Sequence, residues 1–163
     1  MLTRRIARPL LASIFVTGGI DSLRNPGPRV KRSEPVTSRL SETLPLPDDP
    51  EQLVKLNAAL HVGFGMLLAF NKLPRLSAAV LAVTLVPTTV GGHRFWEDDD
   101  PQMRKNQQVH FFKNLAILGG LIVAAADSEG APSLGWRARR ATKKAKKAAK
   151  EARKRATEVL PVG

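Results

Sequence analysis

Four stretches of the chain contain no Asp, Glu, Lys or Arg, and they constrain the fold more than any other feature. They are residues 9–20, 56–70, 76–93 and 114–126. Each is apolar around most of a helical circumference, whereas a helix of a soluble bundle carries polar residues along an outward face. This pattern suits a lipid environment, and we expect the four segments to cross a membrane as helices.

A transmembrane helix needs about 20 residues, so each uncharged core has to be extended by about one turn. The extensions bring in residues such as Arg5, Lys55, Arg75 and Lys113, whose long side chains reach the headgroups or face neighbouring helices. We predict an all-α four-helix transmembrane bundle over residues 1–135, with helices at approximately 5–23, 52–71, 74–92 and 109–127. A soluble helical bundle is the alternative.

The first apolar segment follows Arg4, Arg5 and Arg8, as the core of a signal peptide would. No A-x-A-like cleavage site follows it, and we therefore expect the segment to be retained.

The C-terminal tail, residues 136–163, holds most of the positive charge. Its eleven Lys and Arg against two Glu supply +9 of the formal net charge of +12. We predict that this helical or disordered tail is cytoplasmic and adheres to anionic lipid headgroups. DNA binding and a solvated tail that only sets orientation are the alternatives. The predicted headgroup contacts are Arg137, Arg139, Arg140, Lys143, Lys144, Lys146, Lys147, Lys150, Arg153, Lys154 and Arg155.

Two residue types are missing in a way that excludes functions. Without Cys, the protein itself has no disulfide, Cys-ligated metal site or thiol relay. Without Tyr, and with only two Trp and six Phe, it lacks a rich stacking platform for single-stranded nucleic acid. Nucleic acid is therefore not the partner we expect.

Cations near the helix ends predict the orientation. The N-terminus carries Arg4, Arg5 and Arg8, the link between the second and third helices carries Lys72 and Arg75, and the tail follows the fourth helix. The rule that positive loops stay inside places both termini in the cytoplasm of a multi-pass cell-membrane protein. Five cations in the link at residues 24–51 conflict with this assignment, and we expect the denser tail to prevail.

That link contains six of the twelve prolines, so it cannot be helical throughout. Ser33-Glu34-Pro35 resembles a helix start, after which Val36, Leu40 and Leu44 are spaced for an interfacial helix. An irregular proline-rich loop is the alternative.

Once the topology is assigned, polar residues gather in the outer half of the predicted bundle. Asn57 and His61 share a helical face, as do His110 and Asn114. We predict a polar ligand pocket there, in which Asp21 and Lys113 find partners, with each other as one pairing. The alternative is that these two side chains lie at the headgroup level. The predicted pocket residues are Asp21, Asn57, His61, His93, Arg94, Trp96, Glu97, His110, Lys113 and Asn114.

Three further expectations concern single groups. Arg8 and Asp127 lie at similar depth near the inner face, which predicts an ion pair. His61 and His110 differ in depth, which disfavours haem ligation and a histidine metal site, so we expect no metal and a packed or hydrogen-bonding His61. Pro87 lies among Thr84, Thr88 and Thr89, which predicts a kink whose freed backbone groups are satisfied by hydroxyls.

Several blocks of the sequence resemble the DoxX family, over roughly residues 4–134. They are Phe15-Val16-Thr17-Gly18-Gly19, Asn25-Pro26, Leu56-Asn57-Ala58-Ala59, Leu85-Val86-Pro87-Thr88-Thr89, His93-Arg94-Phe95-Trp96, Asp100-Pro101, Gln107, His110-Phe111-Phe112-Lys113-Asn114 and Leu118-Gly119-Gly120. The resemblance implies a four-helix membrane protein, linked in some members to quinone-coupled oxidation of thiosulfate and to membrane-tethered redox and detoxification enzymes. His61 departs from the residue type expected at its position.

From these features we expect a membrane subunit or scaffold of a redox or detoxification system, with redox enzymes at the membrane as partners. The outer pocket would hold a lipid-like molecule, for which a quinone is a candidate cofactor. A quinone-dependent oxidoreductase is the alternative from another class, and a lipid-handling or transport protein is a third.

Overall fold

The computed structural model describes residues 2–43, 45, 47, 49–127 and 134–159, and every regular element in this part of the chain is helical. The α-helices are α1 (Leu2–Arg24), α2 (Gly27–Thr43), α3 (Pro50–Ala69), α4 (Pro74–Gly92), α5 (Pro101–Ala126) and α6 (Leu134–Val159), with a 3₁₀ turn η1 (Phe95–Glu97) between α4 and α5. The chain divides into two units, Met1–Ala126 and Asp127–Gly163.

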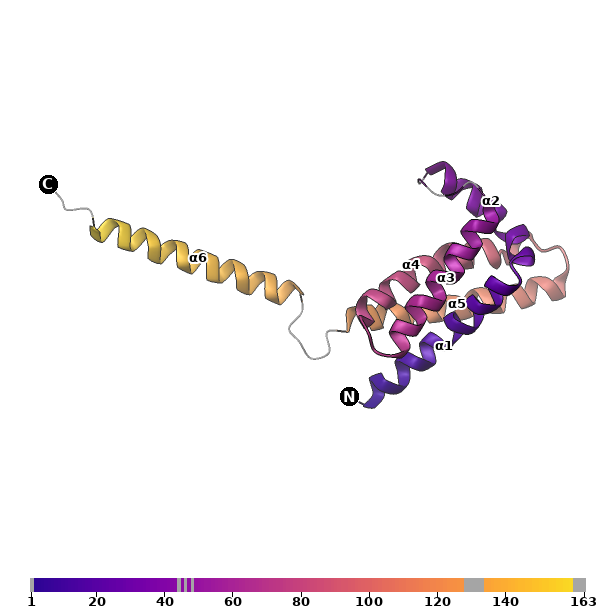
Figure 1. The fold of residues 1–163 in the computed structure, drawn as a ribbon, viewed down its shortest axis with the longest axis horizontal. Helices are drawn as coiled ribbons and strands as arrows, with labels where there is room; N and C mark the ends of the chain where they lie inside the picture. The colour runs from indigo at the N-terminus through magenta and orange to yellow at the C-terminus, as the bar shows by residue number, and fades with distance from the viewer. Residues whose placement is uncertain (1, 44, 46, 48, 128–133, 160–163) are drawn as a thin grey trace. The chain divides into compact units, whose positions relative to one another are not determined.

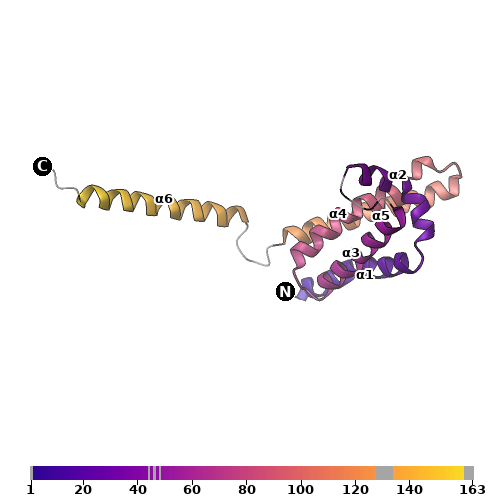
Figure 2. The same cartoon turned by 45° about the horizontal axis from the view of Figure 1, so that its top comes forward.

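In the first unit α1, α3, α4 and α5 run alongside one another (Figures 1 and 2). Packing joins α1 to α3, α3 to α4 and α4 to α5, while α2 lies against α3 and α4. Arg8 of α1 donates a hydrogen bond to Asn71 Oδ1, and Arg75 Nε donates to the carbonyl of Ala125 over 3.0 Å. The start of α1, the α3–α4 turn and the end of α5 therefore share one end of the bundle, here called the Arg8 end.

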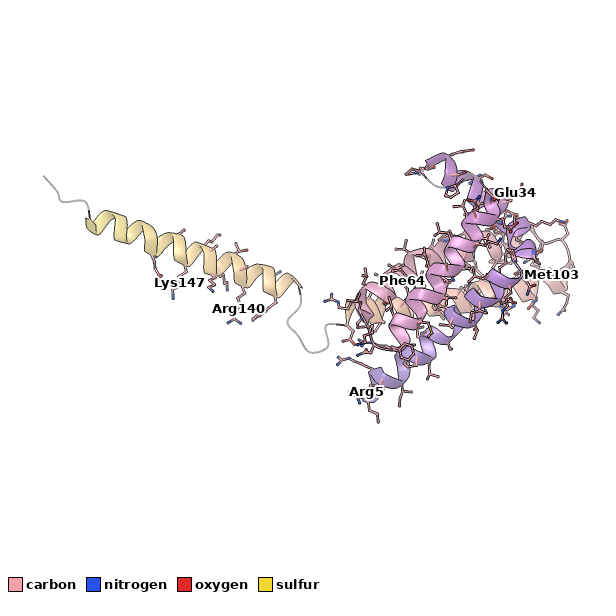
Figure 3. All side chains as sticks on the ribbon, in the orientation of Figure 1. Arg5, Glu34, Phe64, Met103, Arg140 and Lys147 are labelled. Carbon is pink, nitrogen blue, oxygen red and sulfur yellow. The ribbon has the colours of Figure 1, made fainter. Side chains whose placement is uncertain are left out.

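The opposite end, here called the His93 end, carries α2, η1 and the start of α5. Arg5 and Met103 mark the two ends in Figure 3, and Glu34 of α2 lies at the Met103 side. The links between α3 and α4 and between α4 and α5 are short, which makes these neighbours antiparallel, whereas α1 and α3 are joined through α2.

Four helical spans in the described residues are long and apolar enough to cross a membrane, namely Leu2–Arg24, Pro50–Ala69, Pro74–Glu97 (α4 with η1) and Pro101–Ala126. The prediction of an all-α fold with four helices of membrane length is confirmed. Only 11–33% of the residues in an apolar 18-residue window of each helix are buried inside the protein. Large apolar side chains such as Val83 and Val123, each 71% exposed, point outward. An apolar surface of this extent requires lipid as its solvent.

Small residues let α1 and α3 approach closely. A Cβ added to Gly19 would lie 2.9 Å from the Ala58 carbonyl oxygen and 2.8 Å from a Val62 methyl. A Cβ on Gly65 would lie 3.0 Å from a methyl group of Val16. Gly19 and Gly65 therefore allow close helix packing, whereas Gly18 and Gly63 have no neighbouring atom within 4 Å of such a Cβ. The buried core beside this contact is formed by Ala12, Phe15, Leu68, Ala78, Leu81, Leu85 and Leu121.

The link after α1 is a helix over most of its length, which decides between the two predicted alternatives. The predicted start at Ser33 is wrong, because α2 already begins at Gly27 and contains Pro35 in its interior. The position of Leu44 and the side chain of Leu40, two of the three residues in the proposed interfacial stripe, lie outside the described residues. Thr37 is buried, and its hydroxyl bonds the carbonyls of Ser33 and Glu34.

Helix α5 begins at Pro101, eight residues before the predicted start at 109. The carboxylate of Asp100 accepts a 3.0 Å hydrogen bond from the amide of Gln102, and Pro101 occupies the first turn, where its missing N–H costs nothing. Residues 101–108 lie outside the predicted helix, but in the structure they form the polar first two turns of a long helix that continues into the apolar segment.

Candidate functional site

Two asparagine side chains form hydrogen bonds between neighbouring helices of the bundle, near its His93 end. Asn57 Nδ2 of α3 donates to Thr88 Oγ1 over 2.9 Å, and Asn114 Nδ2 of α5 donates to Thr89 Oγ1 over 3.1 Å. Each threonine hydroxyl donates in turn to a carbonyl of its own helix, that of Thr84 or Leu85. Because hydroxyls both donate and accept, adjacent threonines on α4 connect α3 and α5 without leaving these groups unpaired. The threonine hydroxyls beside Pro87 thus serve contacts between helices, and the predicted kink at Pro87 stays a prediction.

One turn further toward the His93 end, a second polar group combines the end of α4 with α5. His93 Nδ1 lies 2.8 Å from Gln107 Oε1, and Gln107 Nε2 lies 3.7 Å from Met103 Sδ. Since the glutamine oxygen can only accept, His93 carries a proton on Nδ1 and donates it. Gln107 is buried, so this pair fixes the first residue after α4 against α5.

His110 adds to the polar contacts around His93 and Gln107. Its ring stacks on that of His93 with centroids 5.2 Å apart and an interplanar angle of 22°. Lys113 Nζ lies 3.1 Å from His110 Nδ1, within reach to donate a hydrogen bond to that nitrogen. When Nδ1 accepts from Lys113, a neutral ring carries its proton on Nε2, which is then a donor on a half-buried residue.

An aromatic cluster adjoins these histidines. Phe95 and Trp96 of η1 pack edge to face at 5.1 Å, and Phe111 of α5 lies 5.5 Å from Phe95 and 5.9 Å from Trp96. Phe112 completes the cluster at 5.7 Å from Phe111, and it is exposed, as is Trp96. Of these four rings only Trp96 was among the predicted pocket residues. The other rings could have been predicted from the sequence Phe111-Phe112, which directly follows His110.

Arg94 and Glu97 belong to a separate, open hollow where α4 ends. Arg94 Nη1 pairs with Glu97 at 3.0 Å, and Arg94 Nη2 donates to the carbonyl of Arg32 over 3.1 Å. Arg32 in turn donates to the carbonyl of Gly92, so α2 is tied to the end of α4. The hollow has a volume of about 170 Å³ and is lined by Arg32, Gly91, Gly92, Arg94, Glu97 and Asp98.

Asp21 and His61 stand apart from the group around His93. Asp21 is exposed and forms a 2.5 Å salt bridge with Arg29 of α2, in place of the hypothesised pair with Lys113. His61 is buried against the edge of Phe15 with ring centroids 5.1 Å apart, and its Nε2 has no hydrogen-bond partner in the described structure. A packed histidine is the interpretation that fits this position.

The predicted Arg8–Asp127 pair stays a prediction, because Asp127 belongs to the second unit. Arg8 itself is 4% exposed and bonds Asn71 in the α3–α4 turn. Within the described residues, no group of three or more His, Asp or Glu side chains has the arrangement to hold a metal ion.

The predicted pocket therefore divides into parts. The structure brings together His93, His110 and Lys113, and places Asn57 and Asn114 on the adjoining threonines of α4. Gln107, which the site prediction missed, joins His93 to this assembly. The resulting group, called the histidine–lysine group below, consists of His93, Gln107, His110 and Lys113. It offers hydrogen-bond donors beside aromatic rings.

Comparison with known proteins supports one family. No curated protein and no solved structure matches the chain. The sequence model of the DoxX family matches residues 4–94, which is more than half of the 163 residues. The matched region includes α1, α3, α4 and His93 but not α5, so the resemblance of residues 100–120 lies beyond it. By this match the chain belongs to the DoxX family of membrane proteins.

Proposed function

We propose that this protein is a membrane subunit or scaffold of a redox or detoxification system that holds a quinone- or lipid-like molecule at the histidine–lysine group. The observation that carries the proposal is the contact of Lys113 with His110, which directs imidazole and ammonium donors to one place on an otherwise apolar bundle. A quinone carbonyl is an acceptor of the kind these donors would bind, and charge-assisted hydrogen bonds are the stronger class.

The residues around the histidine–lysine group suit the ring and the apolar chain of such a ligand. The rings of Phe111 and Phe112 lie beside His110 in sequence and offer faces and edges for a planar head group. The exposed apolar sides of α4 and α5, which include Val86, Val90 and Leu115, would accompany an isoprenoid or acyl chain in the bilayer. Sites of this type combine a mostly apolar wall with few polar groups that orient the ligand.

The charge distribution supports an inside location for the Arg8 end. Sixteen of the 26 Lys and Arg lie in the first two turns of α1, flank the α3–α4 turn or follow α5, namely Arg4, Arg5, Arg8, Lys72, Arg75 and the eleven cations of the tail. By the positive-inside rule both termini are cytoplasmic, and the histidine–lysine group faces the opposite side of the cell membrane.

The test is retention of a small molecule by the purified protein. Lipid extracts of the protein in nanodiscs are analysed by mass spectrometry, and binding of added ubiquinone is followed by quenching of tryptophan fluorescence. Lys113→Met is expected to weaken quinone binding by about tenfold, since a hydrogen bond to a charged group contributes about 1.5–3 kcal/mol. Lys105→Met is the matched control, because it removes the same charge from an exposed position two turns earlier in α5.

Equal binding by the two variants and the unaltered protein would contradict the proposed site. A copurifying lipid without quinone would favour the lipid-handling alternative. Steady reduction of ubiquinone by the purified protein with a supplied electron donor would favour an oxidoreductase over a non-catalytic subunit.

A further inference from the structure

The exposed cations of α6 are confined to one side of the helix. At 100° per residue they fall within an arc of about 160°. Ala141, Ala145 and Ala149 occupy the opposite side, so the helix has a cationic face and an alanine face. Figure 3 shows Arg140 and Lys147 extending from α6 on the same side. The cationic face consists of Arg139, Arg140, Lys143, Lys144, Lys146, Lys147 and Lys150.

Trp136 lies at the centre of this cationic face rather than among the alanines. The guanidinium carbon of Arg140 is 4.8 Å from the ring centroid of Trp136, and the indole is 46% exposed. Tryptophan favours the boundary between headgroups and acyl chains, where its apolar ring and its N–H are both accommodated. A tryptophan in the middle of a cationic stripe matches a headgroup layer better than it matches bulk water.

We propose that the cationic face of α6 lies on the anionic headgroups of the bilayer that the bundle crosses, with Trp136 inserted at the interface. The length of chain outside α6 supports this partner, because Leu134 follows the last residue of α5 by eight positions. Eight residues span at most about 28 Å even when fully extended. Helix α6 is thus tethered within reach of the membrane surface whatever the orientation of the bundle.

The short connection to α5 and the positive charges of α6 both favour binding to the membrane surface. Each cation near an anionic leaflet contributes roughly a fivefold increase in partitioning, which corresponds to about 1 kcal/mol. The alanine face is too small in area to insert by itself, so the cations and Trp136 determine which side meets the membrane. Arg137, Arg153, Lys154 and Arg155 belong to the same helix, and their side chains lie outside the described residues.

Tryptophan fluorescence of the full-length protein in nanodiscs tests this proposal. The chain has two tryptophans, so Trp96→Phe leaves Trp136 as the only one. In nanodiscs that contain phosphatidylglycerol, Trp136 emission is expected to shift to shorter wavelength and to be quenched by brominated acyl chains. In pure phosphatidylcholine the quenching is expected to be weaker. Raising the salt from 0.15 to 1 M shortens the screening length from about 8 to 3 Å and should reverse the effect.

Two matched variants separate charge from helix content. Replacing Lys143, Lys144, Lys146 and Lys147 by Gln keeps helix propensity and is expected to remove the quenching, at roughly fivefold in partitioning per cation. Replacing Ala141, Ala145 and Ala149 by Gln alters the opposite face and should preserve the quenching. If both variants behave alike, or if anionic lipid has no effect, the proposal is overturned.

A second measurement covers the case in which Trp96→Phe disturbs the bundle. Because the chain has no cysteine, Ala149→Cys provides a unique labelling site on the alanine face while both tryptophans are kept. Energy transfer from this label to labelled headgroups should rise in anionic nanodiscs and fall in 1 M salt. A response to added duplex DNA in phosphatidylcholine nanodiscs, without a response to anionic lipid, would overturn the proposal in favour of nucleic acid.

Discussion

The amide of Asn114 donates a 3.1 Å hydrogen bond to the hydroxyl of Thr89, and both side chains are buried between α5 and α4. Thr89 also donates to the carbonyl of Leu85, so its hydroxyl both donates and accepts a hydrogen bond. This contact lies between the apolar core and the histidine–lysine group. It therefore positions α5, which carries Gln107, His110 and Lys113, relative to the end of α4.

A double-mutant cycle with Asn114→Leu and Thr89→Val is expected to give a coupling of about 0.6 kcal/mol and at most about 1.7 kcal/mol, the average and the largest values for hydrogen bonds between membrane helices. The measurement is reversible unfolding in mixed detergent micelles. Thr84→Val serves as the control for Thr89→Val, because the Thr84 hydroxyl bonds the carbonyls of Val80 and Leu81 in its own helix. A coupling near zero would show that the Asn114 contact is not maintained in the membrane.

Gly19→Ala is expected to destabilise the bundle by about 1–3 kcal/mol, the usual cost of overpacking. The added methyl would meet the backbone oxygen of Ala58 at 2.9 Å, and backbone cannot move aside cheaply. Gly18→Ala provides the comparison, since nothing lies within 4 Å of its Cβ and alanine is the better helix former. Equal stability of the two variants in the same unfolding assay would argue against the close α1–α3 approach.

Asn71 combines two roles that substitutions can separate. Its φ of 59° is left-handed, and its side-chain oxygen accepts from buried Arg8. Both Asn71→Gly and Asn71→Ala remove the acceptor, but only Asn71→Gly also removes the Cβ from a left-handed conformation that costs a residue with a Cβ about 1–2 kcal/mol. We expect Asn71→Ala to be less stable than Asn71→Gly by about that amount in thermal unfolding. The reverse order would mean that the α3–α4 turn has a different backbone.

Fusion reporters test the proposed orientation in a bacterial host. Alkaline phosphatase is active only outside the cytoplasm, so a fusion after Gly163 is expected to be inactive and a fusion after Asp99 active. Green fluorescent protein at the same two positions should give the complementary result. Strong phosphatase activity from the C-terminal fusion would place the basic tail outside and reverse the assignment.

The existence and number of the apolar helices could be predicted from the sequence because uncharged segments of this length have few alternatives to lipid. The residues at which these helices begin and end were harder to predict. The start of α5 at Pro101 depends on the capping contact of Asp100. A charged sequence of this kind is equally compatible with a loop. Whether residues 27–43 form a helix could not be predicted for a similar reason, because prolines at both ends and in the interior are compatible with a helix or a loop.

Among the candidate site residues, the sequence determined which polar groups fall near one end of the bundle, since helix direction and rise follow from local chemistry. Only the tertiary structure decided which of them meet. His93 and His110 stack because α4 packs on α5, whereas His61 points toward Phe15 because α3 also packs on α1. Depth along a helix is encoded locally, but the direction a side chain takes around that helix depends on which neighbours occupy each face, and that is a property of the assembled bundle.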